Sequence, residues 1–308
     1  MKIIHIGQQP KQADYTNTGE ILLEIAETLA RKDGTPQILQ IYTYPEEAFM
    51  KRGTQFFSQG EVDSLCRDLQ SLMREYSSTV LCLGILRSET IAGKLFLINS
   101  VLVFYRQEYT VFDKQVISDV DTIRKHCASR QSGTQNFIGD YINRETGSNN
   151  FSHAYFAPQF PAGAPRTPAS PHTFLEKHEK KSDLTVPDQM LTSELMHRTT
   201  GMTADWTWKN YMLISTQNKT VALWVGICME ISSENFLQRY QYWRPQIHFD
   251  TEVTVILSND LSLIHNIDVL PPIPLFYNDK HNRSVYTGRI DTANGSGLQA
   301  FKDGIVEV

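Results

Sequence analysis

Three side chains in this sequence, a glutamate, a lysine and a cysteine, stand where predicted strands end. Glu46 follows a run rich in β-forming residues, Lys114 ends a shorter run, and Cys228 ends a buried apolar run. Sites in layered α/β proteins are built at the ends of strands. A thiol near a base or a cation can act as a nucleophile. The three residues together indicate nucleophilic catalysis by a thiol.

Each of these residues taken alone has a simpler explanation. Cysteine is among the most buried residue types, so Cys228 alone predicts a small apolar core residue. Glutamate and lysine are mostly exposed, so Glu46 alone predicts a turn carboxylate and Lys114 a surface cation. Their joint appearance at three strand ends favours a site.

The elements that would position these residues follow from the spacing of apolar residues. Helical spacing predicts helices over residues 17–32, 62–73 and 233–242. Runs of β-forming residues predict strands at 3–6, 38–44, 79–86, 95–105, 110–112, 221–227, 253–257 and 284–290. Because strands and helices alternate, we expect a layered α/β domain.

Residues 118–217 interrupt this alternation. They hold prolines at 158, 161, 165, 168 and 171, followed by a charged run at 176–182. We therefore expect a single domain over residues 1–308 that carries an atypical insertion at 118–217, near the site.

The composition argues against several other classes of protein. With 29 Lys+Arg and 34 Asp+Glu, the net charge of −5 gives no electrostatic reason to expect a nucleic-acid partner. No apolar run is long enough to span a bilayer and no secretory signal is visible, so we expect no membrane partner and a cytoplasmic location.

The 4 cysteines match no zinc or disulfide pattern, and the spacing of His172, Glu176 and His178 is not diagnostic of a metal site. We expect no metal and no cofactor.

The order and context of these residues resemble the nitrilase, or carbon–nitrogen hydrolase, superfamily. The similarity covers residues 1–117 and 218–308 and rests on five features. They are Gln8-Gln9-Pro10 after the first strand, Pro45-Glu46, Ile98-Asn99-Ser100 inside a strand, Asp113-Lys114, and Gly226-Ile227-Cys228 followed by Glu230.

The resemblance implies a four-layer α-β-β-α sandwich and a Glu–Lys–Cys site. Cys228 would attack a carbonyl or nitrile carbon and form a thioester. Glu46 would take the thiol proton and later activate water, while Lys114 and the backbone N–H of Met229 would stabilise the oxyanion. The implied protein is an enzyme that hydrolyses a non-peptide carbon–nitrogen bond in a small amide or nitrile. A homodimer is implied as well.

The sequence departs from this family in the region after the lysine. Many members carry a second glutamate shortly after it that helps to position substrate, but residues 115–144 contain no glutamate. Glu145 is the first one and is our candidate for that role, with Asp119 and Asp121 as nearer acids. The interval from Lys114 to Cys228 is also unusually long.

Several alternatives stay open. Glu47 could be the base instead of Glu46, since neighbouring residues of a strand face opposite sides and only one can point into the site; we expect Glu46 because it directly follows proline, as in the family. Glu230 is better explained as an acid near a helix N-terminus.

An amide-forming acyltransferase of the same fold, or a catalytically silent binding module, would use the same framework. A Cys–His hydrolase is conceivable, although no cysteine-protease signature surrounds Cys228.

Overall fold

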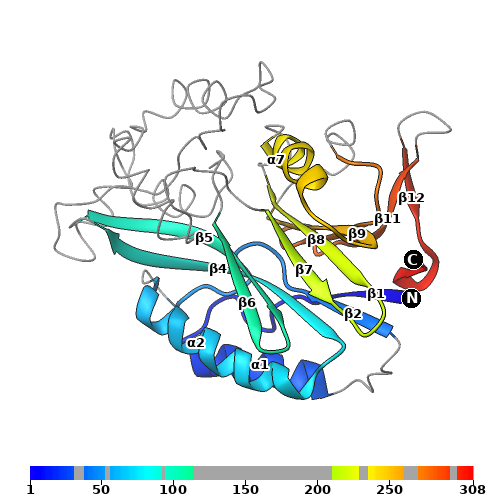
Figure 1. Ribbon diagram of the computed structural model, residues 1–308. Helices are drawn as coiled ribbons and strands as arrows, with labels where there is room; N and C mark the ends of the chain where they lie inside the picture. Colours follow the sequence, from blue (N-terminus) through cyan, green and yellow to red (C-terminus); the bar gives the residue numbers. More distant parts are fainter. Residues whose placement is uncertain are drawn as a thin grey trace, which may run out of the picture.

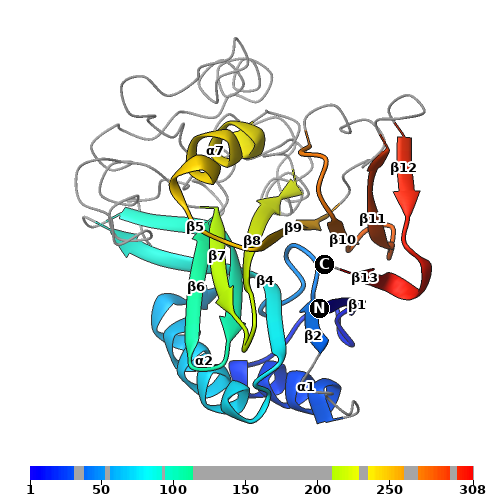
Figure 2. The same ribbon diagram turned by 45° about the vertical axis from the view of Figure 1, so that its right-hand side comes forward.

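The described part of the chain forms two β-sheets that stack face to face, with helices on their outer surfaces (Figures 1 and 2). The computed structural model describes residues 1–30, 38–52, 56–91, 94–113, 210–228, 235–259, 270–291 and 297–307. The layers follow the order α-β-β-α, which confirms the fold class that the sequence resemblance implied.

The first sheet holds the strands from the N-terminal third of the chain and one strand from the C-terminal end. Its strands are β1 (Lys2–Gly7), β2 (Ile38–Thr43), β3 (Phe57–Ser58), β4 (Thr79–Ile91), β5 (Lys94–Tyr105), β6 (Glu108–Asp113) and β13 (Ile305–Glu307). They run in the order β13-β1-β2-β4-β5-β6, with β3 paired to β4, and β1, β2 and β4 are parallel. The parallel strands therefore carry their carboxyl ends to one edge of the sheet.

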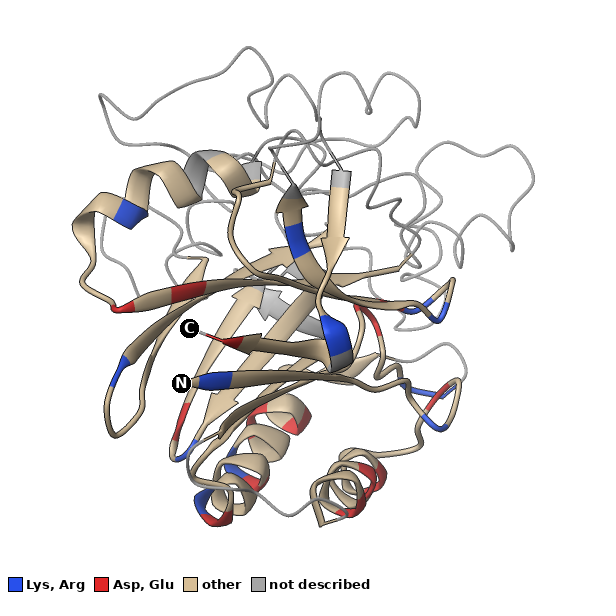
Figure 3. Cartoon of the chain, turned by 90° about the vertical axis from the view of Figure 1, so that its right-hand side faces the viewer, with Lys and Arg blue, Asp and Glu red and all other residues tan. Residues whose placement is uncertain are grey.

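Two helices cover the outer face of the first sheet. They are α1 (Thr18–Ala30) and α2 (Gln59–Leu72), and their charged residues lie on this outer layer (Figure 3). In α2, the Ser58 side chain accepts from the Glu61 backbone while the Glu61 side chain accepts from the Ser58 backbone, a capping box that fixes where the helix begins. A short 3-10 helix (Met73–Glu75) directly follows α2.

The second sheet is built almost entirely from the C-terminal third of the chain. Its strands are β7 (Tyr211–Ser215), β8 (Thr220–Ile227), β9 (Thr251–Ser258), β10 (Leu275–Asp279), β11 (Val285–Asp291) and β12 (Gly297–Ala300). They run in the order β12-β11-β10-β9-β8-β7, and β8, β9 and β10 are parallel. Helix α7 (Asn235–Trp243) covers its outer face, and short 3-10 helices follow at Arg244–Gln246 and Lys302–Gly304.

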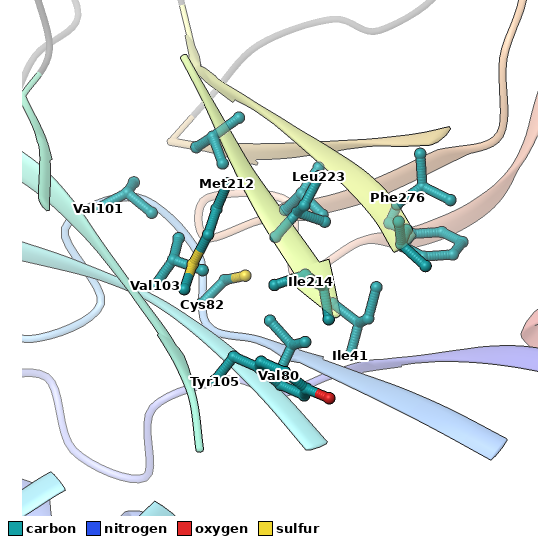
Figure 4. Packing of buried hydrophobic residues seen from close by; sticks show 14 of the residues in the cluster. Ile41, Val80, Cys82, Val101, Val103, Tyr105, Met212, Ile214, Leu223 and Phe276 are labelled. Atoms are coloured by element: carbon teal, nitrogen blue, oxygen red, sulfur yellow. The ribbon is translucent and has the colours of Figure 1, made fainter. Parts of the chain in front are cut away.

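The main core lies between the two sheets. Alternate residues of each strand point into it, as the two-residue period of a strand requires. Figure 4 shows Met212, Ile214, Leu223 and Phe276 of the second sheet facing residues of the first sheet, which are Ile41, Val80, Cys82, Val101, Val103 and Tyr105. This apolar contact holds the two sheets, and hence the two halves of any site between them, in one arrangement.

The sequence predictions hold for the helices and for most strands, but the sequence does not predict five of the strands in the described segments, which are β3, β7, β10, β12 and β13. Strand β7 lies within the predicted insertion, because its alternation of buried and exposed residues over only five positions is a weak signal. Strand β10 follows a proline-rich stretch, and β12 and β13 are too short to detect from a pattern. The remainder of the predicted insertion lies outside the described residues. No helix in the described segments has the length and apolar character needed to cross a membrane.

A buried histidine links the two sheets away from the main core. The His5 ring on β1 lies 2.9 Å from Thr43 Oγ1 and 2.7 Å from Thr287 Oγ1, and it stacks on Phe276. Burial lowers the pKa of His5 to about 3 from an ordinary value of 6.5. The neutral imidazole is therefore a structural part of the sheet contact.

Because His5 stays neutral in the folded protein, we expect the free energy of unfolding to fall at acidic pH. Between about pH 6.5 and pH 3 the unfolded chain binds a proton at His5 and the folded chain does not, so stability falls as pH falls, by about 1.4 kcal/mol per pH unit. The His5→Gln variant lacks this proton uptake. In urea titrations, we expect the difference in unfolding free energy between the two proteins to shrink from pH 7 to pH 4. A constant difference would contradict the assignment.

Candidate active site

Glu46 lies in a buried turn that the chain makes after β2. Its side chain is 1% exposed and that of Glu47 is fully buried. The turn is hydrogen-bonded along β4, with the Tyr44 N–H donating to the Cys82 carbonyl at 2.8 Å and the Phe49 N–H to the Gly84 carbonyl at 3.1 Å. The backbone that carries the two glutamates is thus fixed to the first sheet on both sides.

Gly84 makes this close approach feasible. A Cβ at that position would lie 2.3 Å from the Pro45 carbonyl oxygen and 2.7 Å from the Glu46 Cα. Both are backbone atoms, which cannot swing aside as a flexible side chain does. A glycine in the interior of a strand commonly marks such an approach of another backbone.

One asparagine holds both glutamates. The Asn99 Nδ2 group on β5 donates to Glu46 Oε1 at 2.7 Å and to Glu47 Oε1 at 3.4 Å. The prediction that the two carboxylates face opposite sides is therefore wrong. It assumed a strand, whereas Glu47 has a φ of 53° in a turn, and this left-handed backbone brings its side chain round to the same amide.

The second sheet reaches Glu47 from the ends of β9 and β10. Directly after β9, the Asn259 Nδ2 group donates to Glu47 Oε2 at 3.0 Å. Directly after β10, the Lys280 ammonium donates to the Glu47 carbonyl and contacts the Met50 sulfur. Since Glu47 belongs to the first sheet, these contacts cross between the sheets.

Cys228 stands directly after β8, beside the end of β9. Its thiol is 1% exposed and donates to the Asn259 carbonyl at 4.0 Å. Its φ is 46°, a conformation that costs free energy for a residue with a side chain and that clusters at functional sites. In α/β-hydrolases, a sharp and strained turn at the end of a strand carries the nucleophile.

Burial and charge shift several pKa values around this cluster. Burial lowers the pKa of Lys280, and the nearby carboxylates of Glu47 and Glu46 act in the opposite direction. Burial, reinforced by the charge of Asp279, raises the pKa of Tyr277, whose hydroxyl donates to Asp279 Oδ2 at 3.0 Å beside Cys228. The cluster therefore contains acids, a cation and a thiol, and the acids and the thiol are buried.

The structure brings two of the five predicted site residues into one network. Glu46 and Cys228 are connected through Asn99, Glu47 and Asn259. The other predicted residues, Lys114, Met229 and Glu145, lie outside the described residues, as do Glu230 and the metal candidates His172, Glu176 and His178.

Sequence reasoning missed Asn259 and Lys280. Each follows a strand directly, which is the same signal that selected Glu46 and Cys228. Neither belongs to a motif of its own, and the strand before Lys280 was not predicted. The signal for Asn259 was present at the end of a predicted strand, but an asparagine did not suggest chemistry.

Two buried amide side chains near the network retain hydrogen-bonding capacity. Within the described segments, Asn99 Oδ1 and both amide atoms of Asn210 have no hydrogen-bond partner. Asn210 donates no side-chain bond, but its carbonyl accepts from the N–H of Val225, three residues before Cys228. Buried polar groups are normally satisfied, so these groups are available to a polar ligand.

The described part of the chain has no evident metal site and has one groove away from the cluster. It contains no group of three or more His, Cys, Asp or Glu side chains placed to hold a metal ion. A groove of about 1220 Å³ opens at the opposite end of the sandwich, lined by residues such as Met1, Tyr105 and Lys219. Because β8 begins at that end and Cys228 follows its other end, the groove is separate from the candidate site.

Comparison with known proteins gives similarity in structure but not in sequence. No family model and no curated protein matches the sequence. Among solved structures, the chain is similar to Nit3 of Saccharomyces cerevisiae, described as a member of branch 10 of the nitrilase superfamily. The TM-score is 0.47 and the identity 10%, over 99% of this chain and 88% of that one.

Two further solved structures have comparable similarity. One is XC1258 of Xanthomonas campestris, described as a CN-hydrolase superfamily protein, with a TM-score of 0.43 and 9% identity over 99% of this chain and 88% of that one. The other is a glutamine-dependent NAD⁺ synthetase of Acinetobacter baumannii, with a TM-score of 0.44 and 10% identity over 99% of this chain and 44% of that one. All three TM-scores are below 0.5, so the fold assignment rests on the layers and strand order of this chain itself.

The close contact between Gly84 and the turn that carries Glu46 and Glu47 predicts how a single added methyl group changes the stability of the fold. We expect Gly84→Ala to destabilise the fold by about 1–3 kcal/mol in urea titrations, because the added Cβ overlaps backbone atoms of Pro45 and Glu46. Gly60→Ala in α2 is the matched control, since a Cβ there meets nothing within 4 Å and alanine favours a helix. Equal stability of the Gly84→Ala protein and the wild type would show that the turn lies elsewhere.

Proposed function

We propose that this chain is a carbon–nitrogen hydrolase of the nitrilase superfamily, acting on a small amide or nitrile. Cys228 forms a bond to the carbonyl or nitrile carbon as its proton passes to Glu46. For an amide, the amine leaves with a proton and a thioester remains. Water, activated by Glu46, then cleaves the thioester to the acid and the free thiol.

One observation carries the proposal. A buried carboxylate on the first sheet and a strained, buried thiol on the second sheet belong to the same network of polar contacts, through Asn99, Glu47 and Asn259. Charged and polar groups are rarely buried without a partner or a function. A base and a nucleophile drawn from distant parts of the chain are what a thiol hydrolase requires.

Lys114 completes the proposed site as the cation that stabilises the oxyanion. The support comes from the strand before it. On β6, Phe112 faces the core between the sheets and Asp113 pairs with Ser100, the neighbour of Asn99. Lys114 directly follows this strand in the sequence, and the family resemblance favours it for the site. The backbone N–H of Met229 and the carboxylate of Glu145 are proposed for oxyanion and substrate binding on the family resemblance alone, and a homodimer likewise.

The unpaired amides suit a polar substrate. Asn99 turns its Nδ2 group toward the glutamates, which leaves Oδ1 free to accept from an N–H donor. An amide substrate supplies such a donor. This observation favours an amide over a nitrile as the substrate class.

The same site would serve an acyltransferase, in which an amine instead of water resolves the thioester. A catalytically silent binding module is the third alternative. The fate of the thiol when substrate is added separates the binding module from the two enzymes, because only the enzymes form an acyl adduct.

The test is intact-protein mass spectrometry after incubation with a panel of primary amides and nitriles. We expect an acyl adduct that peptide mapping assigns to Cys228, and its loss in Cys228→Ala with the fold retained. Glu46→Gln should slow turnover by about 10²–10⁴-fold, the usual contribution of a general base.

Cys66→Ala is the matched control, because burial raises the pKa of the Cys66 thiol to about 12 and keeps it protonated. Addition of hydroxylamine distinguishes the two transfer reactions, since an acyltransferase forms the hydroxamate faster than the acid. Turnover that persists in Cys228→Ala, or the absence of an adduct with every compound, would overturn the proposal.

A further inference from the structure

Glu47 accepts hydrogen bonds from three residues, more than a neighbour of the proposed base would need. Its carboxylate accepts from Asn99 of the first sheet and from Asn259 of the second, and its carbonyl accepts from Lys280 of the second. Its left-handed backbone is strained, and such a conformation persists only where the surroundings hold it. A purely structural turn would be more stable with glycine at this position.

Asn259 of the second sheet contacts both Glu47, the neighbour of the proposed base, and the proposed nucleophile Cys228. Its side-chain amide donates to Glu47 at 3.0 Å, and its carbonyl lies 4.0 Å from the Cys228 sulfur. One residue thus touches both the turn that carries the base and the nucleophile. A change in the spacing of the two sheets at this edge alters the contact with Glu47, whereas the contact with Cys228 lies within the second sheet.

Lys280 adds a charge to this geometry. It is half-buried, and its pKa is lowered by burial while Glu47 and Glu46 favour its charged form. Among the described residues, Tyr277 of β10 interacts electrostatically with Cys228 and donates to Asp279. Glu46, Glu47 and Lys280 belong to the hydrogen-bonded network that reaches Cys228 through Asn259. Removing the lysine would leave the carboxylates without this compensation and make the surroundings of the thiol more negative.

We propose that Glu47, Asn259 and Lys280 form an inter-sheet clamp that fixes Glu46 relative to Cys228 and balances the charge around the thiol. They are positioning residues, and none of them reacts with substrate. The inference rests on the proposed function, because it assumes that Glu46 and Cys228 react together.

The test of charge balance measures how fast iodoacetamide alkylates Cys228 as a function of pH, with peptide mapping to separate the cysteines. Lys280→Met removes a positive charge, so we expect the midpoint of the pH profile to rise by at least about half a unit. Glu47→Gln removes a negative charge and keeps the size of the side chain, so the midpoint should fall by a similar amount. The double variant should return close to the wild-type midpoint.

These opposite signs separate the clamp from a role in folding alone. Loss of structure would increase alkylation in both single variants without moving their midpoints apart. Glu24→Gln on α1 is the matched buried carboxylate, held by Tyr15 at 2.7 Å, and Lys2→Met is the matched lysine, paired with Glu307. Neither control should move the midpoint, and thermal unfolding of every variant verifies that it is folded. Should Lys280→Met not fold, Glu47→Gln still provides the downward shift.

Asn259→Ala tests the positioning. It removes a neutral donor, so we expect slower acylation by an amide substrate with the alkylation midpoint unchanged. Acylation at the wild-type rate in this variant, or unchanged midpoints in both charge variants, would overturn the clamp while leaving the proposed function in place. If Cys228 of the wild type is neither alkylated nor acylated, the proposed function and the clamp both fail.

Discussion

Two carboxylates buried at the junction of two sheets constrain this structure more than any other feature. A buried charge is tolerated only with partners, and here one partner lies inside β5 while two others directly follow β9 and β10. Asn99 serves both glutamates from within the first sheet, and Asn259 and Lys280 serve Glu47 from the second. The sandwich must keep its spacing at this edge, because a shift of about 1 Å would leave a buried carboxylate without its hydrogen bond.

Backbone strain is concentrated at the same place. Four residues other than glycine have positive φ in the described segments. Arg106 and Arg283 lie in the connections of the β5–β6 and β10–β11 hairpins, where such angles are ordinary. Glu47 and Cys228 lie outside hairpins, one on each sheet, and Asn259 contacts both. The strain at each, about 1–3 kcal/mol, is sustained by packing between the sheets, which is a property of sites held in one geometry.

The sequence could predict the layers because they depend on periodicity. Helix α2 and strand β8 appear in the sequence as long regular patterns, and their register fixes which residues face the core. It could also predict that Glu46 and Cys228 stand at strand ends. It could not predict that Glu47 turns toward the same amide as Glu46, because this depends on a left-handed backbone angle and on the absence of a Cβ at Gly84.

Lys280 shows why charge balance is harder to predict than a motif. Its distance in sequence from Glu47 is 280 − 47 = 233 residues, and only the pairing of β9 with β10 and the stacking of the sheets bring the two together. A motif records residues that chemistry requires in a given order, whereas a compensating charge can come from any strand end that reaches the site. The position of Lys280 beside the carboxylates therefore follows from the geometry of the sandwich. The net charge around Glu46 and Glu47 therefore depends on Lys280 as well as on the residues of the motif.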